Sequence, residues 1–298
     1  MYMKIQRPLL LAGMLALAIL GAGCMQYQAQ PQTAGTTSPA GATITVTATS
    51  LGNILTDAQG KTLYYFARDT PSSGMSTCYG QCAALWPVFS ANTIVVSPPL
   101  VSSDFSSITR TDGTTQTTYR GWPLYYFQSD SGTGSVNGEG ITGNWFVIRP
   151  DETVMVAQRD TLGTYLTDTM GNTLYFFGKD TNGVSACTGA CLAKWPAFSV
   201  KTVSAPSILN PSDFGSLARP DGINQTTYRG RPLYYFVNDT KPGDANGEGF
   251  LNVWYVANIT GTVPALPATP APAATTTMQT MAPATTAATP SSMSSGGY

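Results

Sequence analysis

The chain repeats itself, and no other feature constrains its fold as strongly. Three segments return 109 residues later and a fourth returns 111 residues later: 78–87 as 187–196, 119–127 as 228–236, 137–145 as 246–254, and 63–66 as 174–177. The change of offset places a two-residue insertion or deletion between Asp69 and Cys78, in a loop of Pro, Ser and Gly that tolerates it. A duplication this regular predicts two similar tandem domains, residues 42–150 and 151–260.

Each half also contains a weaker internal duplication. A run of Leu, two aromatic residues and Phe, then two intervening residues and Asp, occurs four times, at 63–69, 124–130, 174–180 and 233–239. Such runs are apolar on both alternating faces, which is typical of strands covered on both sides. Turn and strand-start signals, Asp-x-x-Gly or Gly-x-Pro, precede them. Because long helical periodicity is absent, the sequence predicts an all-β protein in which each domain duplicates a small β unit, with a short helical turn at each Cys-x-x-x-Cys.

These residues resemble a known family, the secreted-repeat lipoproteins, which are defined by the motif Tyr-x-(Phe/Trp/Tyr)-x-x-Asp. The four copies are Tyr64, Phe66 and Asp69; Tyr125, Phe127 and Asp130; Tyr175, Phe177 and Asp180; and Tyr234, Phe236 and Asp239. The resemblance covers residues 42–260 and includes the paired cysteines and the Trp-Pro after each pair. It implies an exported protein of the cell envelope. It implies no particular chemistry, because the family has no established biochemical activity.

The motif aspartates suit a structural role. Thr or Ser follows each of them, and an Asp at a strand end commonly accepts hydrogen bonds from backbone amides two residues on, which closes an Asx-turn. The competing interpretation, a catalytic carboxylate, requires a nearby partner with a shifted pKa, and nothing in the spacing identifies one. We therefore expect the Tyr, Phe and Asp of the motif to serve the fold.

The amino terminus predicts export. Lys4 and Arg7 precede an apolar run over 9–20, and small residues then lead to Cys24. This order is that of a secretory signal peptide, so we assign residues 1–23 to one. Small residues before a cysteine resemble a lipobox, in which that cysteine becomes lipid-modified, although Gly21 stands where that pattern prefers Leu. We expect Cys24 to carry a lipid anchor; the alternative is ordinary cleavage nearby.

Two segments have the composition of flexible linkers. Residues 24–41 are rich in Gln, Thr, Pro, Gly and Ala, and residues 261–298 are rich in Thr, Ala, Pro and Ser. Neither can bury enough apolar surface to offset the entropy of ordering. We expect a spacer that follows the anchor and a disordered tail.

The remaining four cysteines form two pairs with the same spacing. Export places them in an oxidising compartment, so we expect the disulfides Cys78–Cys82 and Cys187–Cys191. On a helix, residues four apart have Cα atoms about 6 Å from each other, which a disulfide can span. A redox-active pair, or a zinc or iron–sulfur site that draws two thiolates from each domain, are the alternatives.

Composition excludes several function classes. The chain has no histidine, which excludes His-based triads, His metal sites and His-ligated haem. Lys plus Arg is 15 against 16 Asp plus Glu, and binding nucleic acid requires a basic surface. We therefore expect neither a cofactor nor nucleic acid as a partner.

Two further sites are candidates. Asp239, Asp244, Asn246 and Glu248 place oxygen ligands in a glycine-rich loop, which suits calcium; the alternative is a solvated loop.

The five tryptophans could form a platform for sugars, and a shared core role fits them at least as well. Trp122 does not recur in the second half, where Arg231 replaces it, so we expect Trp122 to be the surface residue that contacts a ligand.

These observations predict a non-catalytic lipoprotein of the cell surface with a structural or binding role. Its partners are the membrane, through the anchor, and an envelope polysaccharide or another surface protein. The alternative is an extracytoplasmic redox or metal-handling protein that uses the cysteine pairs. An envelope hydrolase would rest on Glu139 and Glu248, yet the sequence places no second carboxylate at glycosidase spacing.

Overall fold

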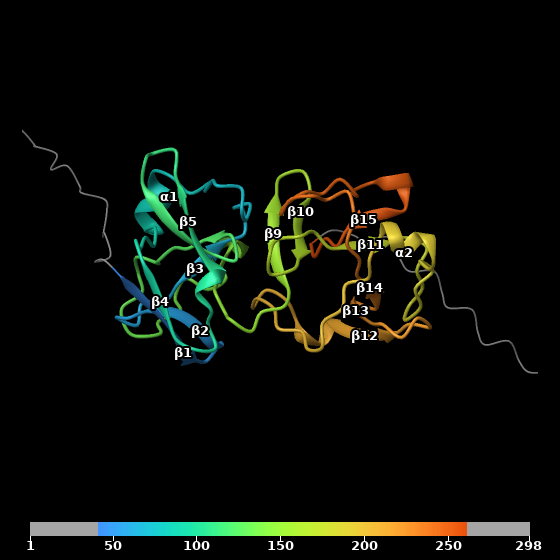
Figure 1. Ribbon diagram of the computed structural model, residues 1–298, viewed down its shortest axis with the longest axis horizontal. Helices are drawn as coiled ribbons and strands as arrows, with labels where there is room; N and C mark the ends of the chain where they lie inside the picture. The colour runs from blue at the N-terminus through green and yellow to red at the C-terminus, as the bar shows by residue number, and fades with distance from the viewer. Residues whose placement is uncertain (1–40, 261–298) are drawn as a thin grey trace, which may run out of the picture. The chain divides into compact units, whose positions relative to one another are not determined.

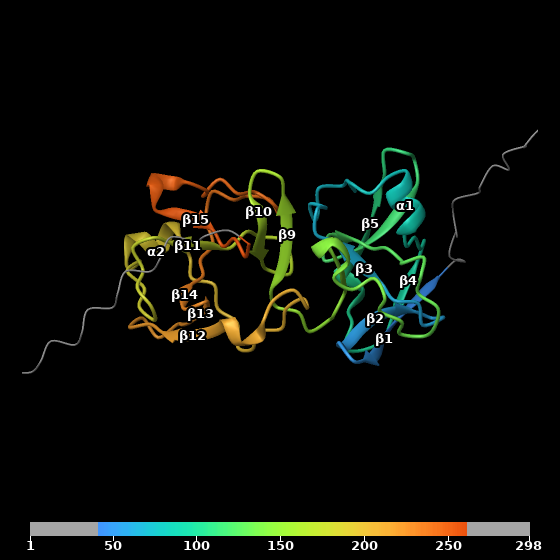
Figure 2. The same ribbon diagram turned by 180° about the vertical axis from the view of Figure 1, so that it is seen from behind.

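A computed structural model describes residues 41–260 of the chain, and short strands dominate it (Figures 1 and 2). The predicted all-β class, the repeated units and the two short helices at the cysteine pairs are confirmed. The predicted signal peptide (1–23), Cys24, nearly all of the spacer and the tail (261–298) lie outside the described residues.

The two halves contain closely matching series of elements. The first half has β1 (Ala42–Thr49), β2 (Gly52–Asp57), β3 (Tyr64–Phe66), α1 (Gln81–Leu85), β4 (Ile94–Val96), η1 (Ser102–Asp104), β5 (Phe105–Thr109), β6 (Thr115–Tyr119), β7 (Trp122–Pro123), η2 (Ile141–Gly143) and β8 (Trp145–Val147). The second half has β9 (Met155–Arg159), β10 (Gly163–Thr167), β11 (Tyr175–Phe177), α2 (Ala190–Lys194), η3 (Pro211–Asp213), β12 (Phe214–Ala218), β13 (Asn224–Tyr228), β14 (Arg231–Pro232), η4 (Phe250–Asn252) and β15 (Trp254–Val256).

Each half is assembled from three small sheets. In the first half their strand orders are β2-β1-β4, β3-β8 and β5-β6-β7, and in the second they are β10-β9, β11-β15 and β12-β13-β14. The Asp-x-x-Gly turns lead into β3 and β11 as their sequence predicts, because the Asp57 carboxylate accepts hydrogen bonds from the amides of Gln59 and Lys61. Asp168 does the same in the second half.

The two β units of each half meet at their motif tyrosines. In the first half, the Tyr64 amide donates to the Tyr125 carbonyl (2.9 Å) and the Tyr125 amide donates to the Tyr64 carbonyl (3.0 Å). Tyr175 and Tyr234 exchange the same pair of bonds. Each pair of motif tyrosines therefore forms an antiparallel bridge that joins the two units of one half.

The halves share a hydrophobic cluster. It includes Trp122 and Phe146 from the first half and Val156 and Leu166 from the second. The Gln158 amide also donates to the Ala67 carbonyl (2.7 Å), so a backbone hydrogen bond joins the halves.

The expectation that Trp122 is a surface residue is wrong. Its side chain is 0% exposed, its ring packs against Tyr65 at 4.9 Å, and its indole N–H donates to the Thr169 carbonyl of the second half. Trp122 does not recur because it forms part of the contact between the halves, which occurs once in the chain. Arg231, at the matching position, is also buried and lies over the Phe176 ring.

None of the five tryptophans is available as a sugar platform. All of them are at most 3% exposed: Trp86, Trp122, Trp145, Trp195 and Trp254. The shared core role is the one that the structure shows.

We predict that Trp122→Ala lowers the free energy of unfolding by about 3–5 kcal/mol, because it removes a large buried side chain that nothing replaces. Denaturant titration measures this loss. Val101→Ala is the control: Val101 is 52% exposed, and its truncation should change the free energy by no more than about 0.5 kcal/mol. A Trp122→Ala chain as stable as the control would contradict the packing described above.

Candidate functional site

Each motif tyrosine donates a hydrogen bond to the motif aspartate of the other β unit. The four bonds are Tyr64 to Asp130 (2.9 Å), Tyr125 to Asp69 (2.6 Å), Tyr175 to Asp239 (2.5 Å) and Tyr234 to Asp180 (2.9 Å). The sequence motif therefore describes an exchange between units: the Tyr of one copy reaches the Asp of its neighbour.

The second carboxylate oxygen of each aspartate holds a loop. It accepts a backbone amide from the loop that follows. The four pairs are Asp69 with Thr77, Asp130 with Asn137, Asp180 with Ala186, and Asp239 with Asn246. These amides lie six to eight residues after the aspartate rather than two. The expected Asx-turn is thus replaced by a longer loop, although the aspartates do accept backbone amides as expected.

The motif phenylalanines cap a stack of four aromatic rings. In the first half, Trp86 and Trp145 are parallel with their centroids 3.8 Å apart; Phe66 stacks on Trp145 at 4.2 Å and Phe127 packs on Trp86 at 4.4 Å. The second half repeats this stack with Phe177, Trp254, Trp195 and Phe236. Each motif tyrosine meets a Trp edge-on, a favourable arrangement for aromatic rings.

The Asn-Gly-Glu-Gly segments close over this stack. A Cβ on Gly138 would lie 2.7 Å from Trp86 and 2.9 Å from Tyr64, so the position excludes any larger residue. The carboxylate of Glu139 accepts the Val147 amide (2.7 Å). Gly247 and Glu248 repeat both contacts. The two glutamates that a hydrolase would need are therefore bound to strand amides.

The predicted disulfides Cys78–Cys82 and Cys187–Cys191 are confirmed, with Cα atoms 5.3 Å and 5.2 Å apart. A four-thiolate zinc or iron–sulfur site is wrong, because all four sulfurs are paired within their own half. Cys78 is buried and Cys82 is half-buried.

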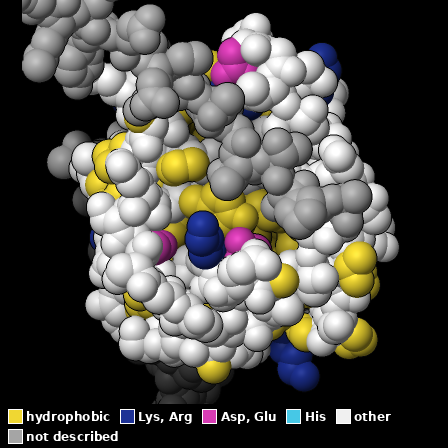
Figure 3. Space-filling model, turned by 90° about the vertical axis from the view of Figure 1, so that its left-hand side faces the viewer, with side chains coloured by type: hydrophobic (Ala, Val, Ile, Leu, Met, Phe, Trp, Pro, Cys, Tyr) yellow, Lys and Arg dark blue, Asp and Glu magenta, His cyan; other side chains and the backbone are white. Residues whose placement is uncertain are grey.

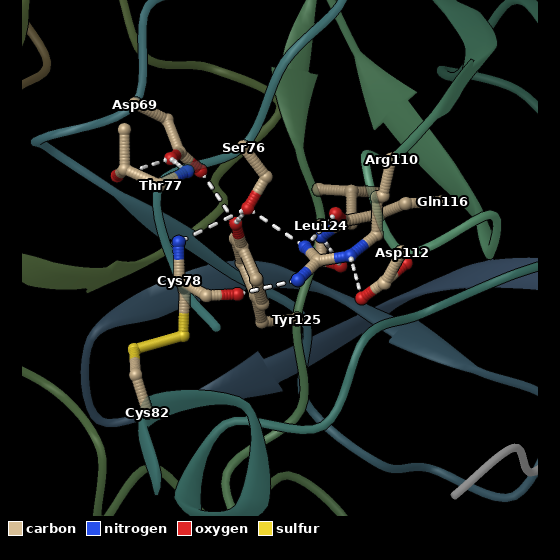
Figure 4. Close-up of a disulfide and its surroundings, with 10 residues drawn as sticks. All are labelled: Asp69, Ser76, Thr77, Cys78, Cys82, Arg110, Asp112, Gln116, Leu124 and Tyr125. Carbon is tan, nitrogen blue, oxygen red and sulfur yellow. Dashed lines mark hydrogen bonds and ion pairs between the residues drawn. A yellow bond between two sulfur atoms is a disulfide. The ribbon is translucent and has the colours of Figure 1, made fainter. Parts of the chain in front are cut away.

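A buried arginine fastens each disulfide loop (Figure 4). The Arg110 guanidinium donates to the Cys78 carbonyl (2.5 Å), to the Ser76 hydroxyl (2.7 Å) and to the Gln116 side-chain oxygen (2.7 Å). The Ser76 hydroxyl lies 2.6 Å from the Tyr125 hydroxyl, so the network continues to the motif carboxylate.

The second half repeats the network with Arg219, Ser185, Gln225 and Tyr234. We did not single out these arginines and glutamines in the sequence. The signal that could have found them is the 109-residue offset, because Arg110 and Gln116 return as Arg219 and Gln225.

Burial dominates the electrostatics of the network. It raises the pKa of Asp180 to about 6, and the hydrogen bonds from Ala186 and Tyr234 and the charge of Arg219 oppose it. Burial also raises the pKa of Asp69 and of the Tyr125 hydroxyl. Chemically, the arrangement is a closed chain of donors and acceptors that fixes the disulfide loop.

The carboxylates among the four expected calcium ligands already accept hydrogen bonds from the protein. Asp239 accepts from Tyr175 and from a backbone amide, Asp244 accepts the amides of Thr240 and Lys241, and Glu248 accepts a strand amide. Within residues 41–260, no group of three or more His, Cys, Asp or Glu side chains is arranged to hold a metal ion.

The surface carries few charges. On the face shown in Figure 3, hydrophobic side chains gather in a hollow beside a basic side chain that has acidic side chains on either side. The described part of the chain contains no helix long and apolar enough to cross a membrane.

Among the comparisons with known proteins, the match is to a protein-family model. A family model described as a secreted repeat of unknown function matches four segments, residues 45–90, 106–149, 156–199 and 215–258. Each matched segment contains one copy of the tyrosine–aspartate motif. No curated protein and no solved structure matches the chain.

We predict that Tyr125→Phe lowers the free energy of unfolding by about 1–3 kcal/mol, because it removes one of the two hydroxyl donors of the buried Asp69 carboxylate. Chemical denaturation measures the difference. Tyr255→Phe is the matched control, since the Tyr255 hydroxyl bonds an exposed carbonyl; it should have little effect. Equal effects of the two substitutions would contradict a special role for the motif hydroxyl.

We predict that Asp180 makes the protein more stable in mild acid. Its pKa is raised to about 6 by burial, so the folded state binds the proton more tightly than the unfolded chain does. The stabilisation is complete below the ordinary pKa of an Asp and is lost as the pH rises through about 6, by up to about 3 kcal/mol. Urea titrations across this range measure the free energy of unfolding, which should depend less on pH in Asp180→Asn than in the parent chain. An equal pH dependence in the two proteins would contradict a raised pKa at Asp180.

Proposed function

The chain belongs to a family of secreted repeats of unknown function, and from that membership we propose that it is a non-catalytic, exported protein held at the cell envelope by a lipid on Cys24. Its folded body then serves as a structural or binding element outside the cytoplasm. Export itself follows from the family; the anchor and the role of the body are the proposal.

One observation supports the non-catalytic role: the polar side chains that recur in all four units hold the fold. Every motif Asp accepts a tyrosine hydroxyl and a backbone amide. Glu139 and Glu248 accept strand amides. A catalytic acid or base has to reach a substrate proton, and these groups already have protein partners.

The redox alternative has less support. Thiol–disulfide exchange needs an accessible sulfur and a leaving thiolate that is stabilised. Cys82 is half-buried, while the loop that carries Cys78 is fastened through the buried guanidinium of Arg110. These contacts favour a disulfide that clamps a loop.

The anchor is tested by Cys24→Ala in the expressed full chain. We expect the parent chain to partition into a detergent phase and to stay on membranes after high-salt washing, because several acyl chains hold a protein firmly. The variant should lose both properties. Met25→Ala, which keeps the cysteine, is the control. Membrane retention of Cys24→Ala equal to that of the parent would remove the anchor from the proposal.

A further inference from the structure

At one corner of the second half, around η4, several side chains are larger or more apolar than their counterparts in the first half, while Lys194 replaces the exposed Leu85. Four positions are more polar or smaller in the first half than in the second: Gln128 against Val237, Ile141 against Phe250, Thr142 against Leu251, and Asn144 against Val253. Both halves fold alike around these positions, with η2 and η4 in matching places. Because Thr142 occupies the matching turn of the first half, the fold does not require a leucine at position 251.

We call Val237, Phe250, Leu251 and Val253 the η4 tip. Leu251 is 75% exposed and Val237 is 48% exposed, while Phe250 and Val253 are half-buried. Phe250 packs against Trp195, so the tip is attached to the aromatic stack. In Figures 1 and 2, η4 (orange) lies beside α2 (yellow).

The backbone of the tip is held in an uncommon conformation. Leu251 has φ 52° and Asn252 has φ 56°, in the left-handed region that side chains with a Cβ seldom adopt. Such conformations are energetically unfavourable and persist where the surrounding structure enforces them. Thr142 adopts the same φ in the first half, so the turn is common to both halves and the exposed leucine is particular to the second.

Two lysines lie next to the tip. The Lys194 ammonium is 4.3 Å from the centre of the Phe250 ring. Lys179 follows Gly178, whose amide donates to the Val253 carbonyl (2.6 Å). Neither lysine forms a salt bridge within residues 41–260, whereas Arg68, the counterpart of Lys179, is paired with Asp160. The nearby Glu248 has one carboxylate oxygen bound to the Val256 amide.

We propose that the η4 tip binds the surface of a bilayer that contains anionic lipids. Exposed apolar side chains enter the boundary between headgroups and acyl chains, while lysines keep their ammonium groups among the headgroups. An anionic membrane surface attracts nearby lysines, so Lys179 and Lys194 make the contact dependent on lipid charge. This inference rests on export, and it holds with or without the lipid on Cys24.

The test places a tryptophan at the tip of the full chain. Leu251→Trp is mixed with vesicles of phosphatidylcholine and phosphatidylglycerol whose acyl chains are brominated, and fluorescence quenching is measured. Thr142→Trp, at the matching position of the first half, is the control. The five native tryptophans are nearly inaccessible and contribute equally to both variants. Near-ultraviolet circular dichroism confirms that each variant is folded.

We expect quenching to be at least twofold stronger for Leu251→Trp than for Thr142→Trp, and to fall when phosphatidylglycerol is omitted or when Lys179 and Lys194 are both changed to Gln. Equal quenching of the two variants, or none at position 251, overturns the proposal. A concentration-dependent shift of the Leu251→Trp emission without vesicles also overturns it, in favour of a second copy of the chain. The same quenching comparison in a Cys24→Ala background excludes the anchor, so the two proposals can fail independently.

Discussion

The hydrogen bond between the tyrosine of one β unit and the aspartate of the next is the interaction on which the rest of the structure depends. Its donor, such as Tyr125, also lies edge-on to a stacked tryptophan, and its acceptor, Asp69, also holds the loop that carries the disulfide. The bond therefore connects the aromatic core to the cross-linked loop. A hydrogen bond to a charged group contributes about 1.5–3 kcal/mol, and burying either partner alone would cost a similar amount.

The exchange of partners explains why the repeat occurs in pairs. A single unit would bury a tyrosine hydroxyl and one carboxylate oxygen without the partners that the other unit supplies, and it would contain only one of the two stacked tryptophans. Two units satisfy both requirements. The four segments that match the family model are therefore two pairs, each of which completes one aromatic stack and one set of tyrosine–aspartate bonds.

Much of this fold could be predicted from the sequence, because residues that recur at the repeat offset mark features that depend on nearby residues. Turn residues such as Asp57, the disulfides and the structural role of the motif all follow from short-range chemistry. Two features could not be predicted. The partner of each tyrosine lies more than 50 residues away, and a motif cannot say which copy it contacts. The second is the position of Trp122: a residue that does not recur need not be exposed, and Trp122 marks the contact between the halves.

That error suggests where the function of such a protein lies. Residues that recur at the repeat offset are fixed by the fold, so their recurrence carries no information about a ligand. Residues that differ between the halves have two explanations: contact between the halves, as for Trp122, or contact with something else. Leu251 is 75% exposed, and the fold does not require its apolar side chain, since Thr142 occupies the same turn with the same backbone angle. An exposed leucine on a turn that folds equally well with threonine is best explained by what lies outside the chain.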